Sequence, residues 1–273
     1  MHRIQALLEM EGPGGMGTLT LSDIKKGPTH RAPRIILGGP EKVGKSTFAA
    51  GMDSPIFLPI AKEEGIDDLD VASFPVANSH QDVIDCIELL IKEDHKYKSF
   101  ALDSCSALDP IITANAITRE GVESQAKLGG GYGRQYDTPC LMWEEIQGGL
   151  DYLRNKKNMV ICLIGHVKVK KFDDPLHEGY DRYQWDLPQP VYAQLARWAD
   201  CMLFANRKVI LRKDEGAKKA RGISGGSPVL YTQPAPGYPA GGRGLYGHLP
   251  PEIDLNWSEF TRAVAEAEKA RQF

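Results

Sequence analysis

The sequence predicts an α/β fold built on a mainly parallel, twisted β-sheet with helices on both faces. Apolar runs of strand length occur at residues 34–37, 54–60, 98–103, 158–166 and 199–204. Segments with apolar residues at helical spacing lie between several of these runs, which is typical of consecutive βαβ units. A glycine-rich motif directly after the first run supplies a turn from a strand into a helix.

That motif has the composition of a phosphate-binding loop, or P-loop. It matches the pattern G-x-x-x-x-G-K-[ST] at every fixed position. The glycines let backbone N–H groups face a phosphate, the lysine adds positive charge, and the serine offers a hydroxyl to Mg²⁺. A chance glycine-rich turn is the alternative, but the flanking strand and helix favour ATP or GTP. With ATP and Mg²⁺ as cofactors, the predicted binding residues are Gly39, Pro40, Glu41, Lys42, Val43, Gly44, Lys45, Ser46 and Thr47.

Polar side chains follow three of the predicted strands. Asp103 ends an apolar run in the manner of a Walker B strand, so it is predicted to hold Mg²⁺ together with Ser46. Glu63 and Glu64 follow the second strand, where one of them would polarise the attacking water or both would belong to a polar loop. His166 follows the 158–164 core and is either a γ-phosphate sensor or a hydrogen-bonded structural histidine. Lys45, Glu63 and His166 are therefore the candidate catalytic residues.

The other elements follow from periodicity and turn residues. We expect a third short strand at 71–76 and helices at 81–92, 142–153 and 191–198. Residues 207–247 have the composition of β-hairpin material, and a final helix begins near Asn256 and Glu259, which resemble a capping box. Residues 1–30 read as a flexible segment that is a possible subunit contact, and residues 31–273 as one core domain that includes the C-terminal hairpin and helix.

Two predicted loops combine cations with aromatic residues. Residues 127–134 contain Tyr132 and Arg134 among four glycines. Residues 167–190 form a long segment in which Lys168, Lys170, Lys171 and Arg182 alternate with tyrosines and a tryptophan. Stacking groups beside cations suit single-stranded nucleic acid without sequence preference. Ordinary flexible loops are the alternative reading, and for a basic cluster at 207–221 a solvated loop is favoured.

The amino-acid composition limits the class of protein to which the chain can belong. The chain has 273 residues, 42% hydrophobic and 25% charged, as an ordinary globular protein does. Its net charge of −3 gives no general sign of nucleic-acid binding, so any such contact must be local. No apolar run is long enough to span a bilayer and no signal-peptide core is present, so we expect a cytoplasmic protein without a membrane partner. Five scattered cysteines without a C-x-x-C pair predict free, buried thiols.

The order of the motifs GPEKVGKS, KEEG, FALDS and LIGH, followed by KKFDDPLHEGYDRYQWDLP and RWADCMLF, resembles the phage-encoded RecA-like core ATPases that include single-strand annealing proteins. The resemblance runs from about residue 34 to the C-terminal helix. It implies a RecA-like P-loop NTPase core that binds ATP and Mg²⁺, assembles into rings or filaments, and anneals single-stranded DNA in recombination. It also suggests the host cytoplasm as location and a single-strand-binding protein as partner.

The resemblance also implies roles for individual residues. Lys45 and Ser46 would bind phosphate and Mg²⁺, Asp103 would be the Walker B carboxylate, and His166 the sensor. Glu63 would be the catalytic glutamate, with Glu64 as the alternative register, and segments 129–134 and 168–185 would be the DNA-facing loops.

One departure from the family pattern concerns hydrolysis. A lysine common in this family is replaced by Gly241, which leaves Arg243 as the basic residue able to reach a neighbour's ATP. Hydrolysis is then expected either to be slow or to rely on a different residue.

Three functions fit these features. The first is a DNA-stimulated ATPase that anneals single strands. The second is a nucleotide-gated DNA-binding or loading factor that hydrolyses little ATP, as the replacement by Gly241 suggests. The third is a small-molecule P-loop kinase in which the cluster at 207–221 would serve as a lid.

Overall fold

The computed structural model describes residues 20–21, 24, 26–27, 31–61, 63, 65–175, 178–208, 210–212, 221–223 and 226–271. Most of the predicted N-terminal segment 1–30 therefore lies outside the described residues. Glu64 and much of the basic cluster at 207–221 lie outside them as well.

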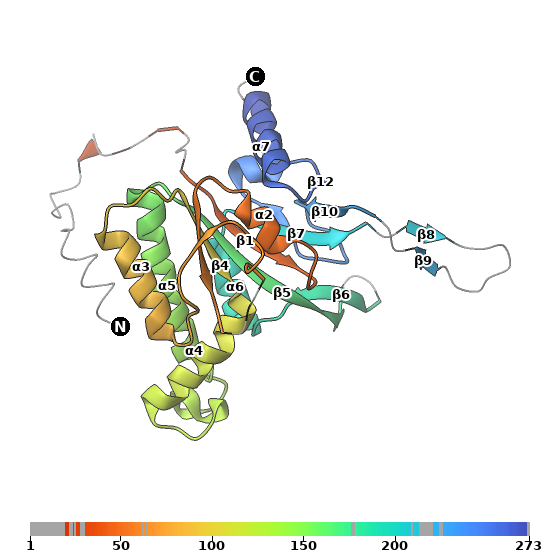
Figure 1. Ribbon diagram of the computed structural model, residues 1–273. Coiled ribbons are helices and arrows are strands. Elements are labelled where there is room, and N and C mark those ends of the chain that lie inside the picture. The colour runs from red at the N-terminus through yellow and green to blue at the C-terminus, as the bar shows by residue number, and fades with distance from the viewer. Residues whose placement is uncertain are drawn as a thin grey trace.

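A ten-stranded, mixed sheet forms the centre of the molecule (Figure 1). Its strands run in the order β12-β10-β7-β1-β5-β4-β2-β3. The parallel strands are β1 (Arg34–Gly39), β2 (Pro55–Pro59), β3 (Ala72–Ser73), β4 (Ser99–Asp103), β5 (Val160–Phe172) and β7 (Cys201–Arg207). The antiparallel additions are β6 (Tyr180–Trp185), β10 (Pro228–Tyr231), β11 (Gly241–Gly242) and β12 (Glu252–Asp254). This confirms the predicted mainly parallel α/β fold.

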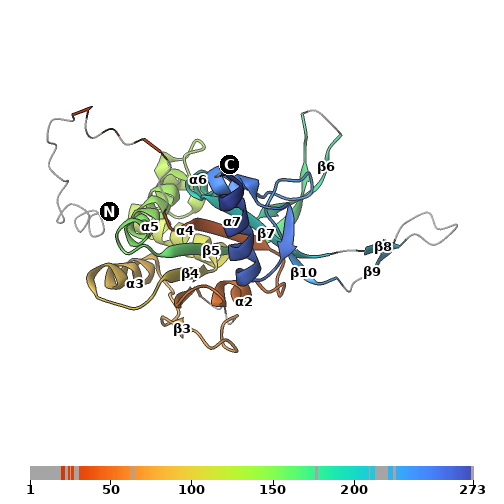
Figure 2. The same cartoon turned by 90° about the horizontal axis from the view of Figure 1, so that it is seen from above.

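Helices cover both faces of the sheet (Figures 1 and 2). One face packs against α3 (His80–Lys92), α4 (Cys105–Glu120), α5 (Asp137–Lys156) and α6 (Gln189–Trp198). The other packs against α2 (Lys45–Ala50) and α7 (Trp257–Arg271). Along β5, Ile161 and Leu163 enter the first core while Cys162 and Ile164 enter the second. A strand buried on both sides has apolar residues at successive positions, which explains the unbroken apolar run.

Local sequence signals account for several helix ends. Ser79 accepts a hydrogen bond from the backbone N–H of Asp82, and Asp82 accepts one from the backbone N–H of Ser79, which makes a capping box for α3. Gly121 ends α4 in the left-handed conformation that glycine adopts without strain. The predicted helix at 81–92 is confirmed and begins one residue earlier.

Two sequence-based expectations are wrong. The strand expected to end at His166 continues to Phe172 and pairs antiparallel with β6, so the expected long loop at 167–190 is largely a β-hairpin. We call residues 167–172 and 180–185 the β5–β6 arm. The hairpin material expected at 207–247 contains β8 (Ile210–Arg212), which pairs antiparallel with β9 (Arg221–Ile223), and β10, which pairs antiparallel with β7 and β12. The third strand covers only Ala72–Ser73, not 71–76.

The described cysteines are all free, as expected; three of them are buried, whereas Cys86 and Cys140 are half-buried. Burial raises the pKa of the Cys86 thiol to about 11. Within the described part of the chain, no helix is both long and apolar enough to cross a bilayer.

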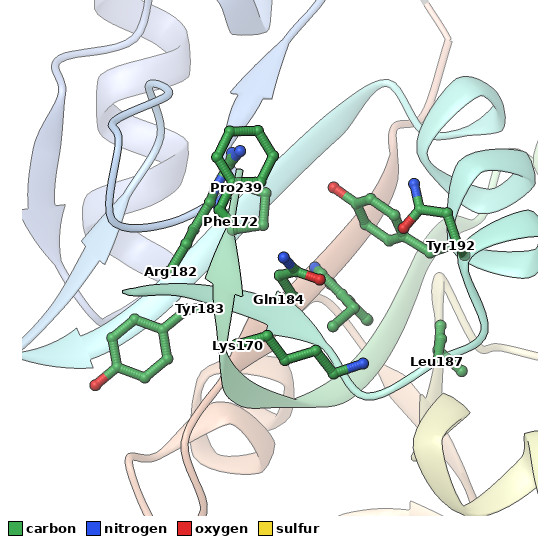
Figure 3. A pocket seen from close by; sticks show the side chains of 10 residues that line it. Lys170, Phe172, Arg182, Tyr183, Gln184, Leu187, Tyr192 and Pro239 are labelled. Carbon is green, nitrogen blue, oxygen red and sulfur yellow. The ribbon is translucent and has the colours of Figure 1, made fainter. Parts of the chain in front are cut away.

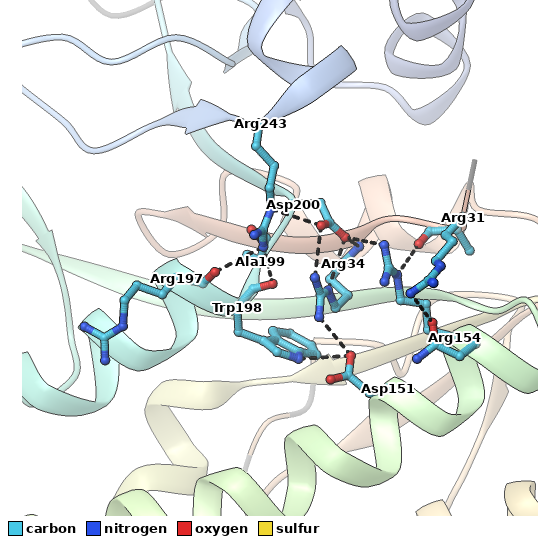
Figure 4. A network of polar contacts seen from close by, with 11 residues as sticks. Arg31, Arg34, Asp151, Arg154, Arg197, Trp198, Ala199, Asp200 and Arg243 are labelled. Atoms are coloured by element: carbon cyan, nitrogen blue, oxygen red, sulfur yellow. Dashed lines mark hydrogen bonds and ion pairs between the residues drawn. The ribbon is translucent and has the colours of Figure 1, made fainter. Parts of the chain in front are cut away.

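An ionic network ties together the amino ends of the central strands (Figure 4). Asp200 precedes β7 and pairs with Arg34 of β1 at 3.1 Å and with Arg154 of α5 at 3.0 Å. Arg34 also reaches Asp151 at 3.0 Å. Burial by itself favours the neutral acid, but the hydrogen bonds from Arg34 outweigh it and hold the pKa of Asp200 below its usual range. The buried carboxylate of Asp200 therefore links β1, β7 and α5, because Arg34 and Arg154 both use it as a countercharge.

Replacing Asp200 with Asn should lower the free energy of unfolding by about 3 kcal/mol, because the guanidinium groups of Arg34, Arg154 and Arg243 all lose this largely buried carboxylate as a partner. Since the folded-state pKa of Asp200 is depressed, its contribution is full above the unfolded value of about 3.9 and is lost as the pH falls through the folded value. Urea titrations of the two proteins from about pH 7 to about pH 3 should therefore converge towards the acid end. Asp94→Asn, at an exposed position after α3, is the control. An unfolding free energy for Asp200→Asn equal to that of the control would contradict the role of the network.

Candidate nucleotide site

The P-loop joins β1 to α2 at the carboxyl edge of the parallel strands. Its two fixed glycines are needed for different reasons. Gly44 has φ 110°, a conformation that L side chains rarely adopt. A Cβ added at Gly39 would lie 2.4 Å from the carbonyl oxygen of Ala205 in β7, so no side chain fits there. The backbone path therefore requires glycine at position 44, and the close packing of β1 against β7 requires glycine at position 39.

Lys45 is buried beneath the loop. Its Nζ donates hydrogen bonds to the carbonyl oxygens of Gly39 at 2.9 Å and Pro40 at 2.8 Å. Burial lowers the pKa of Lys45, and the nearby carboxylates of Asp103 and Glu63 act in the opposite direction. The ammonium group thus lies inside the loop, where a bound phosphate would offer it a charged partner in place of two carbonyls.

Ser46 and Asp103 come together at the end of β4. Ser46 Oγ donates a hydrogen bond to Asp103 Oδ2 at 2.6 Å. Asp103 is only 5% exposed, and this burial raises the pKa of its carboxyl group. A Cβ added at Gly65 would lie 3.4 Å from Ser46 Oγ and 3.9 Å from Asp103 Oδ2, so glycine keeps the space beside both oxygens free. A hydroxyl, a carboxylate and open space fit Mg²⁺.

No group of three or more His, Cys, Asp or Glu side chains that could hold a metal ion occurs in the described ranges. Mg²⁺ is commonly held by only one or two protein oxygens together with water and substrate phosphates. The two oxygens of Ser46 and Asp103 match that mode of binding better than a metal cage made by the protein alone.

Glu63 and His166 form the third part of the site. Glu63 Oε1 accepts hydrogen bonds from Ser104 Oγ at 2.9 Å and from His166 Nε2 at 3.1 Å. The bond from His166 is the main cause that lowers the pKa of Glu63, so this carboxyl group is ionised near neutral pH. The backbone N–H of His166 in turn donates to Ser106 Oγ at 3.0 Å. An ionised carboxylate held by two donors can orient a water molecule.

The register of the sheet explains why these residues meet. β5 lies between β1 and β4, with His166 opposite Gly39 and Ile164 opposite Asp103. Lys45, Ser46, Glu63, Asp103 and His166 therefore gather at one edge, and the structure brings together all of the predicted phosphate, Mg²⁺ and catalytic candidates. Their roles stay predictions.

Trp185, at the base of the β5–β6 arm, lies against the same strands. A Cβ added at Gly38 would lie 2.9 Å from its ring, and one added at Gly165 would lie 2.2 Å from it. Because Gly38 and Gly165 have no side chains, the buried indole of Trp185 fits directly behind the P-loop and His166. Sequence reasoning missed this contact, as it missed Ser104 and Ser106. The glycine that interrupts the apolar run before His166 was the available signal.

The DNA-binding candidates are only partly brought together. Strand alternation places Lys168, Lys170 and Arg182 on one face of the β5–β6 arm and Lys171 on the other. Tyr132 is fully exposed and Arg134 pairs with Asp137 at 2.9 Å. Both lie at the turn after the 3₁₀-helix Gln125–Gly130, which Figure 1 draws beyond the lower end of α4, away from the arm. Lys168 is also engaged, with Asp186 at 2.7 Å.

Arg243 is bound within its own chain. Its Nη2 donates to the carbonyl oxygens of Trp198 and Ala199 at the end of α6, and its Nε lies 3.1 Å from Asp200 (Figure 4). This position is at the amino edge of the parallel strands, opposite the P-loop. The expectation that Arg243 reaches a neighbour's nucleotide stays a prediction.

Comparison with known proteins returned one family. The family model described as AAA domain matches residues 31–244, a range that includes the P-loop, Glu63, Asp103, His166 and the β5–β6 arm. No curated protein matches the chain.

Gly165→Ala should lower the free energy of unfolding by about 2 kcal/mol, because the new methyl group would overlap the ring of Trp185. Gly237→Ala is the matched control, since a Cβ at that position meets nothing within 4 Å. Urea denaturation measures both. When Trp185→Leu is present, Gly165→Ala should lower the free energy of unfolding by less than it does in the wild type. Strictly additive effects of the two substitutions would show that the two residues do not interact.

Proposed function

Because the chain belongs to the AAA domain family of nucleotide-binding ATPases, we propose that it couples ATP at the P-loop to the binding and annealing of single-stranded DNA in recombination. The observation that carries the proposal is the continuity of β5. This one strand supplies His166 to the nucleotide site and Lys168 and Lys170 to a basic, aromatic arm.

The site residues suit in-line hydrolysis of a nucleoside triphosphate. Lys45 and the loop N–H groups would hold the phosphates, and Ser46 with Asp103 would hold Mg²⁺, which neutralises charge on the transferred group. Glu63 would accept the proton of the attacking water as the water oxygen bonds to the γ-phosphorus and ADP leaves. The depressed pKa of Glu63 keeps it in the form that can accept that proton.

The arm suits a single strand of DNA. Lys168, Lys170 and Arg182 share one face with Phe172 and Tyr180, whose ring centroids are 5.6 Å apart. Exposed cations attract phosphates, and aromatic rings stack with bases of any sequence. The net charge of −3 does not oppose this, because the arm concentrates positive charge on one small surface.

His166 is the proposed link between the two sites. It contacts Glu63 at 3.1 Å and precedes the first residue of the arm. A γ-phosphate that attracts the His166 side chain would move this residue. His166 belongs to the same strand as the DNA-binding face. Binding of ATP would then change how the arm presents its cations.

Self-assembly into a ring or filament, a phage origin and a single-strand-binding partner complete the proposal. The motif resemblance supports these three points. The exposed Leu21 and Ile24, at 86% and 71%, are described residues of the N-terminal segment that a neighbouring subunit would cover.

A second candidate is a nucleotide-gated DNA-binding factor with little hydrolysis. Gly241 in place of a lysine favours it, because one of the basic residues expected to act on a neighbour's ATP is missing. A kinase is less favoured. Figures 1 and 2 both draw β8 and β9 far from α2, so these strands do not form a lid over the P-loop.

Lys45→Ala should abolish nucleotide binding, whereas Glu63→Gln should keep ATP binding and lower the rate of hydrolysis about 100-fold or more. Isothermal titration with an ATP analogue and a phosphate-release assay with single-stranded DNA separate the two effects. Lys96→Ala is the control, because Lys96 is an exposed lysine in the loop between α3 and β4, outside the P-loop. If the wild type shows nucleotide-dependent DNA binding without turnover, the gated factor is the better description.

Lys170→Ala/Arg182→Ala should weaken binding of a dT oligonucleotide and lower the slope of log K against log salt by roughly 1.4, since each lost phosphate contact on a single strand accounts for about 0.7. Lys171→Ala removes one charge from the opposite face and should alter the affinity much less. Fluorescence anisotropy at several salt concentrations measures both. Equal losses in the two proteins would show that DNA does not use the proposed face.

A further inference from the structure

A cavity of about 210 Å³ lies between the β5–β6 arm and α6 (Figure 3). Lys170, Phe172, Arg182 and Gln184 come from the arm, and Tyr192 faces them from α6. Trp185, Leu187 and Pro239 complete its apolar lining. The side chain of Tyr183 points away from the group (Figure 3). The volume is below the roughly 300–1,000 Å³ of pockets that bury drug-sized ligands, so the cavity fits one ring system.

The walls of the cavity offer flat aromatic surface. The rings of Trp185 and Tyr192 are stacked with their centroids 6.2 Å apart. Trp185 is buried, and burial raises the pKa of Tyr192, so the phenol stays neutral over the physiological range. Gln184 and Gln189 bring amide groups that can hydrogen-bond to the edge of a planar heterocycle. An aliphatic ligand would use neither feature.

The rim of the cavity is positive. Among the described residues, neither Lys170 nor Arg182 pairs with a carboxylate, and Arg182 Nε is buried without a hydrogen-bond partner. The guanidinium carbon of Arg182 lies 5.0 Å from the centre of the Phe172 ring, which holds this cation beside the apolar surface. A neutral planar pocket next to two cations without countercharge is complementary to a base joined to phosphates.

We propose that this cavity takes one unstacked base of a DNA single strand while Lys170 and Arg182 hold the adjoining phosphates. The inference rests on the proposed binding of single-stranded DNA and adds a pocket for a single base to it. A base in a duplex is stacked and paired, so it enters such a cavity only after it has been freed from both. The arm would thereby bind single strands in preference to duplexes and keep at least one base out of the stack.

The test compares two oligonucleotides of equal length, one with bases and one fully abasic, which present the same phosphates. Wild-type protein should bind the strand with bases roughly tenfold more tightly. Tyr192→Leu should reduce this ratio several-fold and leave the affinity for the abasic strand unchanged. Tyr192→Phe, which keeps the ring, should retain the wild-type ratio. Gln189→Trp fills the cavity from an exposed position without removing a packed side chain, and should also reduce the ratio.

The outcomes separate the two levels of the proposal. If neither strand binds, the proposed function itself fails. If both strands bind wild-type protein equally, or if neither Tyr192→Leu nor Gln189→Trp changes the ratio, DNA binding stands and the base pocket is overturned. Free dAMP, added with the P-loop saturated by an ATP analogue, probes the other source of a base. Binding of dAMP that Tyr192→Leu abolishes, with the DNA ratio unchanged, would assign the cavity to a free nucleotide and overturn the inference.

Discussion

The insertion of β5 between β1 and β4 is the constraint on which the candidate site depends. Parallel pairing on both sides sets His166 beside Gly39 and Ile164 beside Asp103. A slip of one residue would reverse the two faces of β5 and exchange the residues that fill the two cores. The packing of Ile161 and Leu163 on one side and Cys162 and Ile164 on the other therefore also fixes where the polar side chains meet. Core and site are determined by the same register.

Much of this arrangement could be predicted because short-range patterns carry it. The apolar runs, the P-loop glycines and the strand-end residues Asp103 and His166 each follow from a few adjacent positions. The β5–β6 arm was misjudged because its interleaved cations and aromatic residues were taken as a long loop, although Val167, Lys168, Val169 and Lys170 alternate as a strand does. The pairing of β10 with β7, and the binding of Arg243 to α6, join residues far apart in the chain. No local pattern encodes such contacts.

The two edges of the sheet serve different purposes. At the amino edge, Asp200 forms ion pairs with Arg34, Arg154 and Arg243, and these pairs hold strands and helices together. At the carboxyl edge, Lys45, Asp103 and Glu63 have shifted pKa values in close proximity, and Lys45 binds only backbone carbonyls. Perturbed groups without a full set of charged partners are typical of functional sites. This contrast agrees with the motifs, which also make the carboxyl edge the candidate functional site.

The unbroken path of β5 has a mechanical consequence. Beyond His166 the strand continues for six residues to Phe172, a length of about 20 Å. The pairing with β6 supports this length, and Trp185 packs over Gly38 and Gly165 at its base. A tilt of only ~5° at the sheet edge would carry the tip through roughly 2 Å. Any such tilt of the sheet edge beside the P-loop would therefore displace the tip of the arm further than its base.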